Sequence, residues 1–307
     1  LQIKAVDLSV YKGHIEPTEH PQNATTERPR TTGTHARDVR LQKLVDDMRA
    51  ADVDKPIDYE LNWGNPVNGS LDTSYYPLFT HVNETIFERP VYRALVDVYT
   101  NDVFIPQVCE AETPINKDPR RELVLKNVFY NFTSTKVFQL AFEYLKEIKT
   151  VDILVWYILP LQRTTRQFRI GKHWLMDGSS SRLAIAGFEH VFVGEWKGTK
   201  VDGQHSWVKY YLLEKRGAIN YHGYIRHDEN LAGTIQYTWE TYRKPIGGFN
   251  IGTSPAFDFS LLSVCALTKT GRGCRFTIDG FPMGVTSYLQ KCGNQNDTCI
   301  ATAYPVN

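Results

Sequence analysis

The pattern of apolar residues changes near residue 150, and this change limits the fold more than any other feature of the sequence. Before it, apolar residues recur at helical spacing and predict amphipathic helices over 38–51, after Pro90 and over 135–148. After it, short alternating or aromatic runs separated by glycine-containing turns are typical of antiparallel strands. These runs are HVFVGEW, SWVKYYLLE, INYHGYI, TIQYTWE, FDFSLLSVCALT, CRFTIDGF and CIATAYPV. Helices followed by strands predict an α+β fold.

The same change predicts two lobes behind a lead-in. Residues 1–37 are rich in proline, threonine and charge, which is typical of a flexible segment. We expect a helical N-terminal lobe over 38–150 and a sheet-rich lobe over 151–307 that holds the functional cleft. No apolar run reaches the roughly 18 residues that a membrane helix needs. The longest, VDILVWYILPL at 151–161, indicates a buried strand or a short core helix.

The charge balance excludes a globally basic protein. The chain has 35 Lys and Arg against 34 Asp and Glu, a formal net charge of +1. Any site for a polyanion must therefore be a local patch. Hydrophobic residues make up 42% of the chain, which is enough for a packed core and excludes wholesale disorder.

Four of the five cysteines form two close pairs in the C-terminal part of the chain. Cys265 and Cys274 bracket ALTKTGRG, which indicates a hairpin loop, and Cys292 and Cys299 bracket GNQNDT. In an oxidising compartment, disulfides would close both loops and leave Cys109 over. Reduced thiols in the core are the alternative.

Five N-x-S/T sequons favour the oxidising compartment. The asparagines that would carry N-glycans are Asn23, Asn68, Asn83, Asn131 and Asn296. Together with the cysteine pairs they predict a secreted protein whose signal peptide has been removed.

Two histidines fifteen positions apart are the main candidates for chemistry. His190 and His205 each lie beside a strand-like run, VFVGE and WVKYYLLEK, so neighbouring strands would bring both imidazoles to one cleft. Imidazoles titrate near neutral pH, as a general acid and a general base must. A single histidine in a strand is more often structural, so the hypothesis of acid–base catalysis depends on the two histidines together. Lys244 would present an ammonium to a developing negative charge, although most lysines are simply solvated.

Other side chains have weaker signals. Thr286 and Tyr288, two residues apart in a predicted strand, would face the same side and could read and stack a base. An ordinary half-buried strand is the alternative. Glu189 and Glu195 flank the first histidine and would orient its ring or bind a divalent ion. The segment HGYIRHDE (222–229) groups histidines and acids but matches no metal motif, and we interpret it as a turn.

These residues stand in a chain that resembles the EndoU family of endoribonucleases. The resemblance is carried by GFEHVFVGE (187–195), HSWVKYYLLEKRG (205–217), Lys244 with IGTSPAFDFSLLSVCALT, and the closing IATAYPV. It extends to LQKLVDDMRAADVD (41–54) and YPLFTHVNETIFERPVY (76–92), so it covers about 38–307. It implies the family's fold, a helical lobe followed by a catalytic lobe of antiparallel sheets.

The resemblance also implies a catalytic centre. The family's triad falls on His190, His205 and Lys244, with His205 as base, His190 as acid and Lys244 stabilising charge on the non-bridging oxygens. The two glutamates of the family fall on Glu189 and Glu195. Eukaryotic members are usually stimulated by manganese, so Mn²⁺ is the expected cofactor. Because the sequence shows no strong metal motif, we expect a bridging or structural ion near Glu189 or Glu195.

The implied reaction is endonucleolytic cleavage of single-stranded RNA, preferentially at uridines. The 2′-OH of the substrate attacks its own phosphodiester, leaving 2′,3′-cyclic phosphate and 5′-OH ends, so DNA is not a substrate. The base-recognition pair of the family, Thr-x-Tyr, falls on Thr286 and Tyr288. Family members commonly have a serine that contacts uracil where this chain has Gly248. Its absence predicts a looser uridine preference, unless neighbouring backbone N–H groups substitute.

Two other functions are compatible with the sequence. One is a catalytically silent RNA-binding protein on the same fold, which the intact triad and Thr-x-Tyr pair argue against and which Gly248 favours. The other is a secreted structural or carrier protein, which the sequons and cysteines suit equally well. RNA binding that weakens strongly with salt would exclude the carrier.

Overall fold

The computed structural model describes residues 38–101, 103, 104, 106, 117–148, 187–271, 273–292 and 297–307. Residues Arg37–Asn307 form one compact unit. Helices alternate in it with mainly antiparallel sheets, which confirms the predicted α+β class. The expected lead-in and the apolar run at 151–161 lie outside the described residues. The division into lobes at residue 150 stays a prediction.

Helices dominate the described residues before 150. The α-helices there are α1 (Val39–Ala51), α2 (Pro90–Thr100), α3 (Pro119–Thr133) and α4 (Lys136–Glu147). Helices α1, α2 and α4 confirm the three that the apolar spacing predicted. Helix α3 was missed, although Asp118 caps it and Pro119 begins it, which is a helix start signal.

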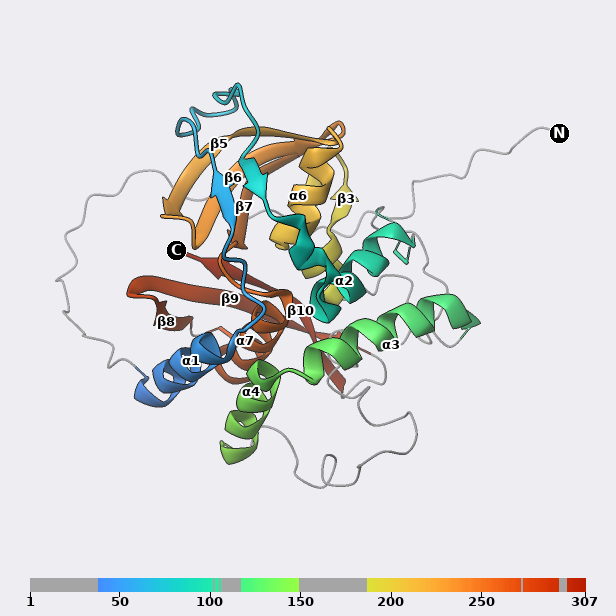
Figure 1. The fold of residues 1–307 in the computed structure, drawn as a ribbon, viewed down its shortest axis with the longest axis vertical. Helices are drawn as coiled ribbons and strands as arrows, with labels where there is room; N and C mark the ends of the chain where they lie inside the picture. The colour runs from blue at the N-terminus through green and yellow to red at the C-terminus, as the bar shows by residue number, and fades with distance from the viewer. Residues whose placement is uncertain are drawn as a thin grey trace, which may run out of the picture. The chain divides into compact units, whose positions relative to one another are not determined.

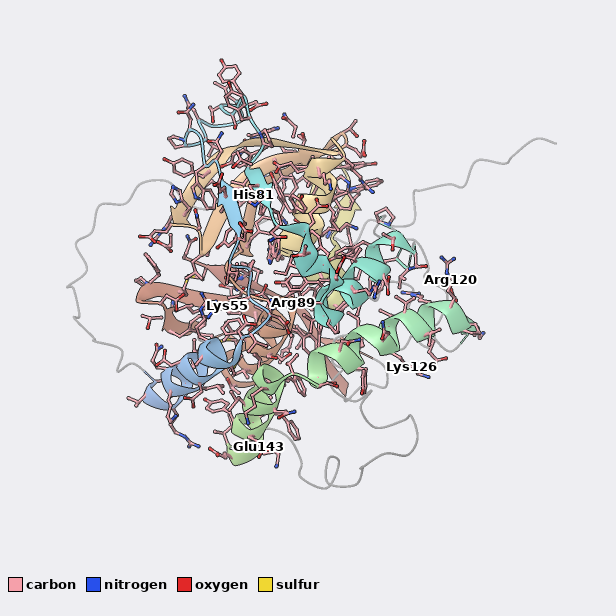
Figure 2. The ribbon with its side chains drawn as sticks, viewed as in Figure 1. Lys55, His81, Arg89, Arg120, Lys126 and Glu143 are labelled. Atoms are coloured by element: carbon pink, nitrogen blue, oxygen red, sulfur yellow. A yellow bond between two sulfur atoms is a disulfide. The ribbon has the colours of Figure 1, made fainter. Side chains whose placement is uncertain are left out.

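Each of the helices α3 and α4 carries an ion pair on its surface. Lys126 pairs with Glu122 one turn away, and Glu143 pairs with Lys146 (Figure 2).

Between α1 and α2 the chain forms a two-stranded sheet of β1 (Tyr59–Leu61) and β2 (Phe79–Val82), followed by the 3₁₀ turn η1 (Glu84–Glu88).

Two larger sheets follow. The five-stranded sheet has the order β3-β4-β7-β6-β5. Its strands β5, β6 and β7 lie side by side in Figure 1. Its strands are β3 (Glu195–Lys197), β4 (Lys200–Asp202), β5 (Ile219–Asp228), β6 (Ala232–Trp239) and β7 (Tyr242–Asn250). Strands β4 and β7 pair parallel at Lys200 and Arg243, and the other pairings are antiparallel.

The three-stranded sheet has the order β10-β9-β8 and is antiparallel throughout. Its strands are β8 (Cys274–Ile278), β9 (Phe281–Cys292) and β10 (Asp297–Val306). Helix α7 (Pro255–Lys269) packs against α3 and α4 and also against β9 and β10, so it joins the helices to this sheet (Figure 1).

Three runs that we predicted as strands are helical, and those predictions were wrong. VFVGE lies mostly in the π-helical turn η4 (Glu189–Val193), WVKYYLLEK forms α6 (Trp207–Lys215), and FDFSLLSVCALT lies in α7. The cause is burial. Every residue of α7 from Pro255 to Ala266 is buried, so no polar face marks the helical period. Helix α6 is also buried around most of its circumference, and its aromatic residues mimic a strand.

Two smaller interpretations also need correction. HGYIRHDE is not a turn, because 222–228 belong to β5. Cys265 and Cys274 form the expected disulfide, but their loop is not a hairpin, since Cys265 lies within α7 and Cys274 begins β8. Cys109 and the side chains of Cys292 and Cys299 lie outside the described part.

Candidate active site

His190 lies in the turn η4, and the residues two positions before and after it, Phe188 and Phe192, have buried aromatic rings. The rings of Phe188 and Phe192 lie 5.0 Å apart. They pack against Phe129 and Phe132 of α3 at 5.2 and 6.1 Å. These contacts anchor the turn to the core, and the His190 side chain stays 12% exposed. The imidazole is therefore fixed and still accessible.

His205 lies in the loop before α6, which is bonded directly to η4. Gln204 N donates to the carbonyl of His190 and His205 N donates to that of Val191, both at 2.7 Å. Gly203 permits this contact, because its φ is 63° and a Cβ there would lie 1.9 Å from the His190 carbonyl oxygen. The main chain thus joins the two histidines, and their ring centroids lie 6.3 Å apart.

The His205 ring is held by a hydrogen bond and a stacked ring. Its Nδ1 lies 2.9 Å from the carbonyl oxygen of Gly248. A carbonyl only accepts, so in the neutral ring Nδ1 carries the hydrogen and Nε2 the lone pair. Tyr304 of β10 stacks on the imidazole, with centroids 5.0 Å apart and an interplanar angle of 16°.

The surroundings of His205 favour its neutral form. Burial lowers the pKa of His205 well below 6.5, and the charges of Lys244 and His190 lower it further, while the bond to Gly248 acts in the opposite direction. At pH 7 the ring is therefore uncharged.

Lys244 reaches the same loop from β7, where it pairs with Tyr237 of β6. The residue is 6% exposed, and its Nζ donates to the carbonyl of Gly203. Burial lowers the pKa of Lys244 to about 8, against the attraction of Asp202. Most of the population keeps the positive charge at neutral pH, beside a neutral His205.

The two candidate glutamates are both buried next to His190. Glu195 Oε1 lies 3.3 Å from His190 Nδ1, which is the geometry of a carboxylate that orients the ring. Within the described ranges, no three His, Cys, Asp or Glu side chains lie close enough together to hold a metal ion. Glu189 and Glu195 thus complete no protein-only metal site in this part of the chain, and the expected Mn²⁺ stays a prediction.

Thr286 and Tyr288 lie on β9, and their two-residue spacing puts them on one side of that strand. Tyr288 is 55% exposed. A second Thr-x-Tyr pair lies on β10, where Tyr304 pairs with Thr286 and Thr302 with Tyr288. Cross-strand partners share a face, so the four side chains form one patch. Tyr304 is the member of this patch that contacts His205.

The sequence reasoning missed Thr302, Tyr304 and Gln204. Thr302 Oγ1 is buried and has no hydrogen-bond partner among the described residues. Gln204 is fully buried, and its Oε1 accepts from the Tyr237 hydroxyl at 2.6 Å. The repeated Thr-x-Tyr spacing in IATAYPV was a usable signal for the first two. The contact of Gln204 with a residue 33 positions away left no local signal.

Gly248 lies where β7 approaches β10. A Cβ at this position would lie 2.5 Å from the carbonyl oxygen of Pro305. The closeness of the two main chains therefore explains why this chain has a glycine there. The same glycine supplies the carbonyl that holds His205.

Known proteins are similar to this chain in sequence and in fold. A family model described as endoribonuclease XendoU matches residues 40–305. The uridylate-specific endoribonuclease of Mus musculus is 30% identical over 81% of this chain and 60% of its own length. That of Paralichthys olivaceus is 32% identical over 76% of this chain and 60% of its own length. The solved structure of XendoU, a splicing-independent snoRNA processing endoribonuclease, matches with a TM-score of 0.68 and 26% identity, covering 88% of this chain and 97% of that one.

The fold and the site together define an α+β protein with two histidines and a buried lysine around one loop. The chain belongs to the endoribonuclease XendoU family, which confirms the resemblance seen in the sequence. It spans about 60% of the length of the Mus musculus and Paralichthys olivaceus relatives. None of the helices in the described ranges is long and apolar enough to cross a membrane.

Proposed function

We propose that this chain is an endoribonuclease that cleaves single-stranded RNA, preferentially at uridines, through attack by the 2′-OH of the substrate. The observation that carries the proposal is the convergence of His190, His205 and Lys244 on one loop in a member of the XendoU family. Imidazole rings whose centroids lie 6.3 Å apart are close enough for one to take the proton of the 2′-OH and the other to protonate the 5′ oxygen of the same phosphodiester.

His205 is the proposed general base. Its Nδ1 hydrogen is engaged by the Gly248 carbonyl, so Nε2 presents the lone pair. Burial and the neighbouring positive charges keep the pKa of His205 low, and the ring is therefore ready to accept a proton at pH 7. It takes the proton of the 2′-OH as the 2′ oxygen forms its bond to phosphorus.

His190 is the proposed general acid. Its Nδ1 faces the Glu195 carboxylate, which compensates the charge of the protonated ring and leaves Nε2–H to donate. That proton passes to the 5′ oxygen as its bond to phosphorus breaks. The products are a 2′,3′-cyclic phosphate and a 5′-hydroxyl, and no protein nucleophile is consumed.

Lys244 is proposed to stabilise the charge that builds up on the non-bridging oxygens. Its ammonium is buried and held by the Gly203 carbonyl, so it interacts strongly with a nearby anion. A pKa of about 8 leaves it charged at pH 7 and neutral in more alkaline solution.

Base recognition is proposed for the face shared by β9 and β10. Thr286 and Tyr288 are the residues that the sequence suggested, and Thr302 and Tyr304 lie beside them on the same face. The stacking of Tyr304 on His205 places it nearest the catalytic group. With Gly248 close to Pro305, we propose that uridine preference rests on these hydroxyls and rings.

Secretion, glycosylation and manganese stimulation are further proposals. The Cys265–Cys274 disulfide supports an oxidising compartment. Among the described sequons, Asn68 and Asn83 are exposed, but the Asn83 amide nitrogen donates to Asp58, and that of Asn131 donates within α3. We propose Asn68 as a glycan site. No step of the mechanism is assigned to Mn²⁺, since the described residues offer no three-ligand group.

The test is cleavage of a short fluorogenic oligonucleotide with one ribo-uridine in a deoxy background, with manganese and with chelator. The variants His190→Ala and His205→Ala should lose cleavage. His81→Ala is the control, because His81 lies on β2 and pairs with Asp58 (Figure 2). RNA binding without cleavage by the wild-type protein would favour the silent binder, and absence of salt-dependent binding would favour the carrier.

A further inference from the structure

The hydroxyl of Tyr99 contacts both segments that carry the catalytic histidines. Tyr99 lies near the end of α2, and its hydroxyl oxygen is 3.0 Å from the carbonyl oxygen of Phe192 and 3.1 Å from Ser206 Oγ. Phe192 lies in η4 two residues after His190, and Ser206 directly follows His205. One side chain from the helices before residue 150 therefore bridges the two halves of the catalytic pair.

The hydrogens of this bridge can be assigned from chemistry. A carbonyl only accepts, so the single hydrogen of the Tyr99 hydroxyl goes to Phe192, and Ser206 supplies the hydrogen of the second bond. Ser206 occupies the N-cap of α6, where a serine oxygen usually accepts from a helix N–H. Here it makes no capping bond. Its hydroxyl serves the contact with Tyr99 instead.

The Tyr99 ring itself is fixed. The ammonium of Lys209 lies 4.9 Å from the Tyr99 ring centroid and 5.1 Å from that of Trp239, a cation–π arrangement on two ring faces. Burial raises the pKa of Tyr99 above its usual value of 10.0, so the hydroxyl keeps its hydrogen across the working pH range. The Tyr99 hydroxyl therefore stays neutral and keeps donating to the Phe192 carbonyl.

We infer that Tyr99 is a positioning residue for RNA cleavage, which sets the relative placement of His190 and His205 through Phe192 and Ser206. This inference rests on the proposed function. The main-chain bonds from Gln204 and His205 to η4 join the same two segments, and Tyr99 joins them at a third point. Without that point, the loop before α6 can move relative to η4 and admit water to His205.

The main experiment compares Tyr99→Phe with Tyr92→Phe. Tyr92 is a matched control, because it lies on the same helix and also donates its hydroxyl to a backbone carbonyl, that of Asp54 at 2.9 Å. We expect Tyr99→Phe to lower kcat on a uridine-containing oligonucleotide by about tenfold and to leave KM close to the wild-type value. Tyr92→Phe should keep the wild-type kcat.

The pH dependence separates positioning from a loss of stability. Water admitted to His205 would raise its pKa toward 6.5, so the acidic limb of the kcat profile should move to higher pH in Tyr99→Phe and stay in place in Tyr92→Phe. Ser206→Ala breaks the same bridge from the other side and should give the same shift. The two changes should then be non-additive in the double variant. Ser206→Ala also carries the test if Tyr99→Phe does not fold.

Titration of the histidine rings by NMR gives a readout that needs no RNA. The expected result is a higher His205 pKa in Tyr99→Phe and an unchanged one in Tyr92→Phe. Equal kcat, equal pH profiles and equal titration curves for the two variants would overturn the inference. Absence of cleavage by the wild-type protein would overturn the proposed function instead, and the titration would still decide whether Tyr99 positions the pair.

Discussion

Restoring the family's serine by Gly248→Ser should damage the site instead of sharpening its specificity. The new Cβ would lie 2.5 Å from the carbonyl oxygen of Pro305, where ordinary contacts begin at 3.4 Å and real ones almost never fall below 3.0 Å. The crowded atom belongs to the main chain, so no rotamer change relieves the contact. Strands β7 and β10 must therefore separate by about 0.5–0.9 Å.

That movement would disturb both supports of His205. Gly248 provides the carbonyl that accepts from Nδ1, and Pro305 directly follows Tyr304, which stacks on the ring. Overpacking of this kind typically costs about 1–3 kcal/mol of unfolding free energy. A displacement approaching 1 Å near a reacting group typically costs about 100-fold in rate. We expect losses of this size in Gly248→Ser.

The assay measures kcat on oligonucleotides with one ribo-uridine or one ribo-cytidine, together with urea unfolding. Gly252→Ala is the control, because the nearest atom to its new Cβ would be Leu231 Cδ1 at 3.1 Å, a side-chain end that can move. A Gly248→Ser protein with wild-type kcat and stability and a stronger uridine preference would refute the reasoning. It would show that β7 and β10 accommodate a side chain at this point.

Three further predictions concern pH and the disulfide. Activity should persist below pH 6.5, since the pKa of His205 is lowered, and should fall above about pH 8 as Lys244 loses its charge. A Lys244→Arg variant that keeps activity should lose less of its rate above about pH 8 in a pH–rate profile, because only the contribution of Lys244 deprotonation is removed. Burial raises the pKa of Asp258 from 3.8 to about 7, so its protonation stabilises the fold at low pH and that stabilisation is lost as pH rises through 7. In the Asp258→Asn variant, the unfolding free energy from urea unfolding should no longer fall between about pH 5 and about pH 8. An equal fall in the wild-type protein and the variant would contradict this prediction. Cys265 and Cys274 are 9 positions apart, and replacing both with serine should lower the unfolding free energy by about 2–3 kcal/mol. An unchanged midpoint of urea unfolding would show that closing this loop does not stabilise the fold.

The sequence predicted α1, α2 and α4, which have a polar face, and failed on α6 and α7, which do not show one. Helix α3 also has a polar face but was missed. Helices α1, α2 and α4 alternate buried and exposed residues, so their period is visible. Helix α7 is buried from Pro255 to Ala266 and α6 around most of its circumference, so neither shows a clear polar face. Local pattern cannot separate such a helix from a buried strand, because both lack a solvent-facing side.

The candidate site was predictable only where one segment carried the signal. His190 and His205 could be found because the loop and η4 lie close in sequence. Tyr304 and Tyr99 reach His205 and its neighbours from segments about 100 residues away, and no local pattern shows such contacts. Fold-level resemblance assigned the Thr-x-Tyr element to β9, whereas the contact with His205 comes from β10.

The placement of the proposed catalytic groups depends on backbone carbonyls at glycines. The Gly248 carbonyl fixes the tautomer of His205, and the Gly203 carbonyl holds the Lys244 ammonium. Gly203 also lets its loop lie against the His190 carbonyl. In both places a Cβ would overlap a backbone oxygen. Such contacts fix the proposed acid, the proposed base and Lys244 relative to one another. Small shifts between β7, η4 and the loop before α6 should therefore change the rate more than replacement of most surrounding side chains.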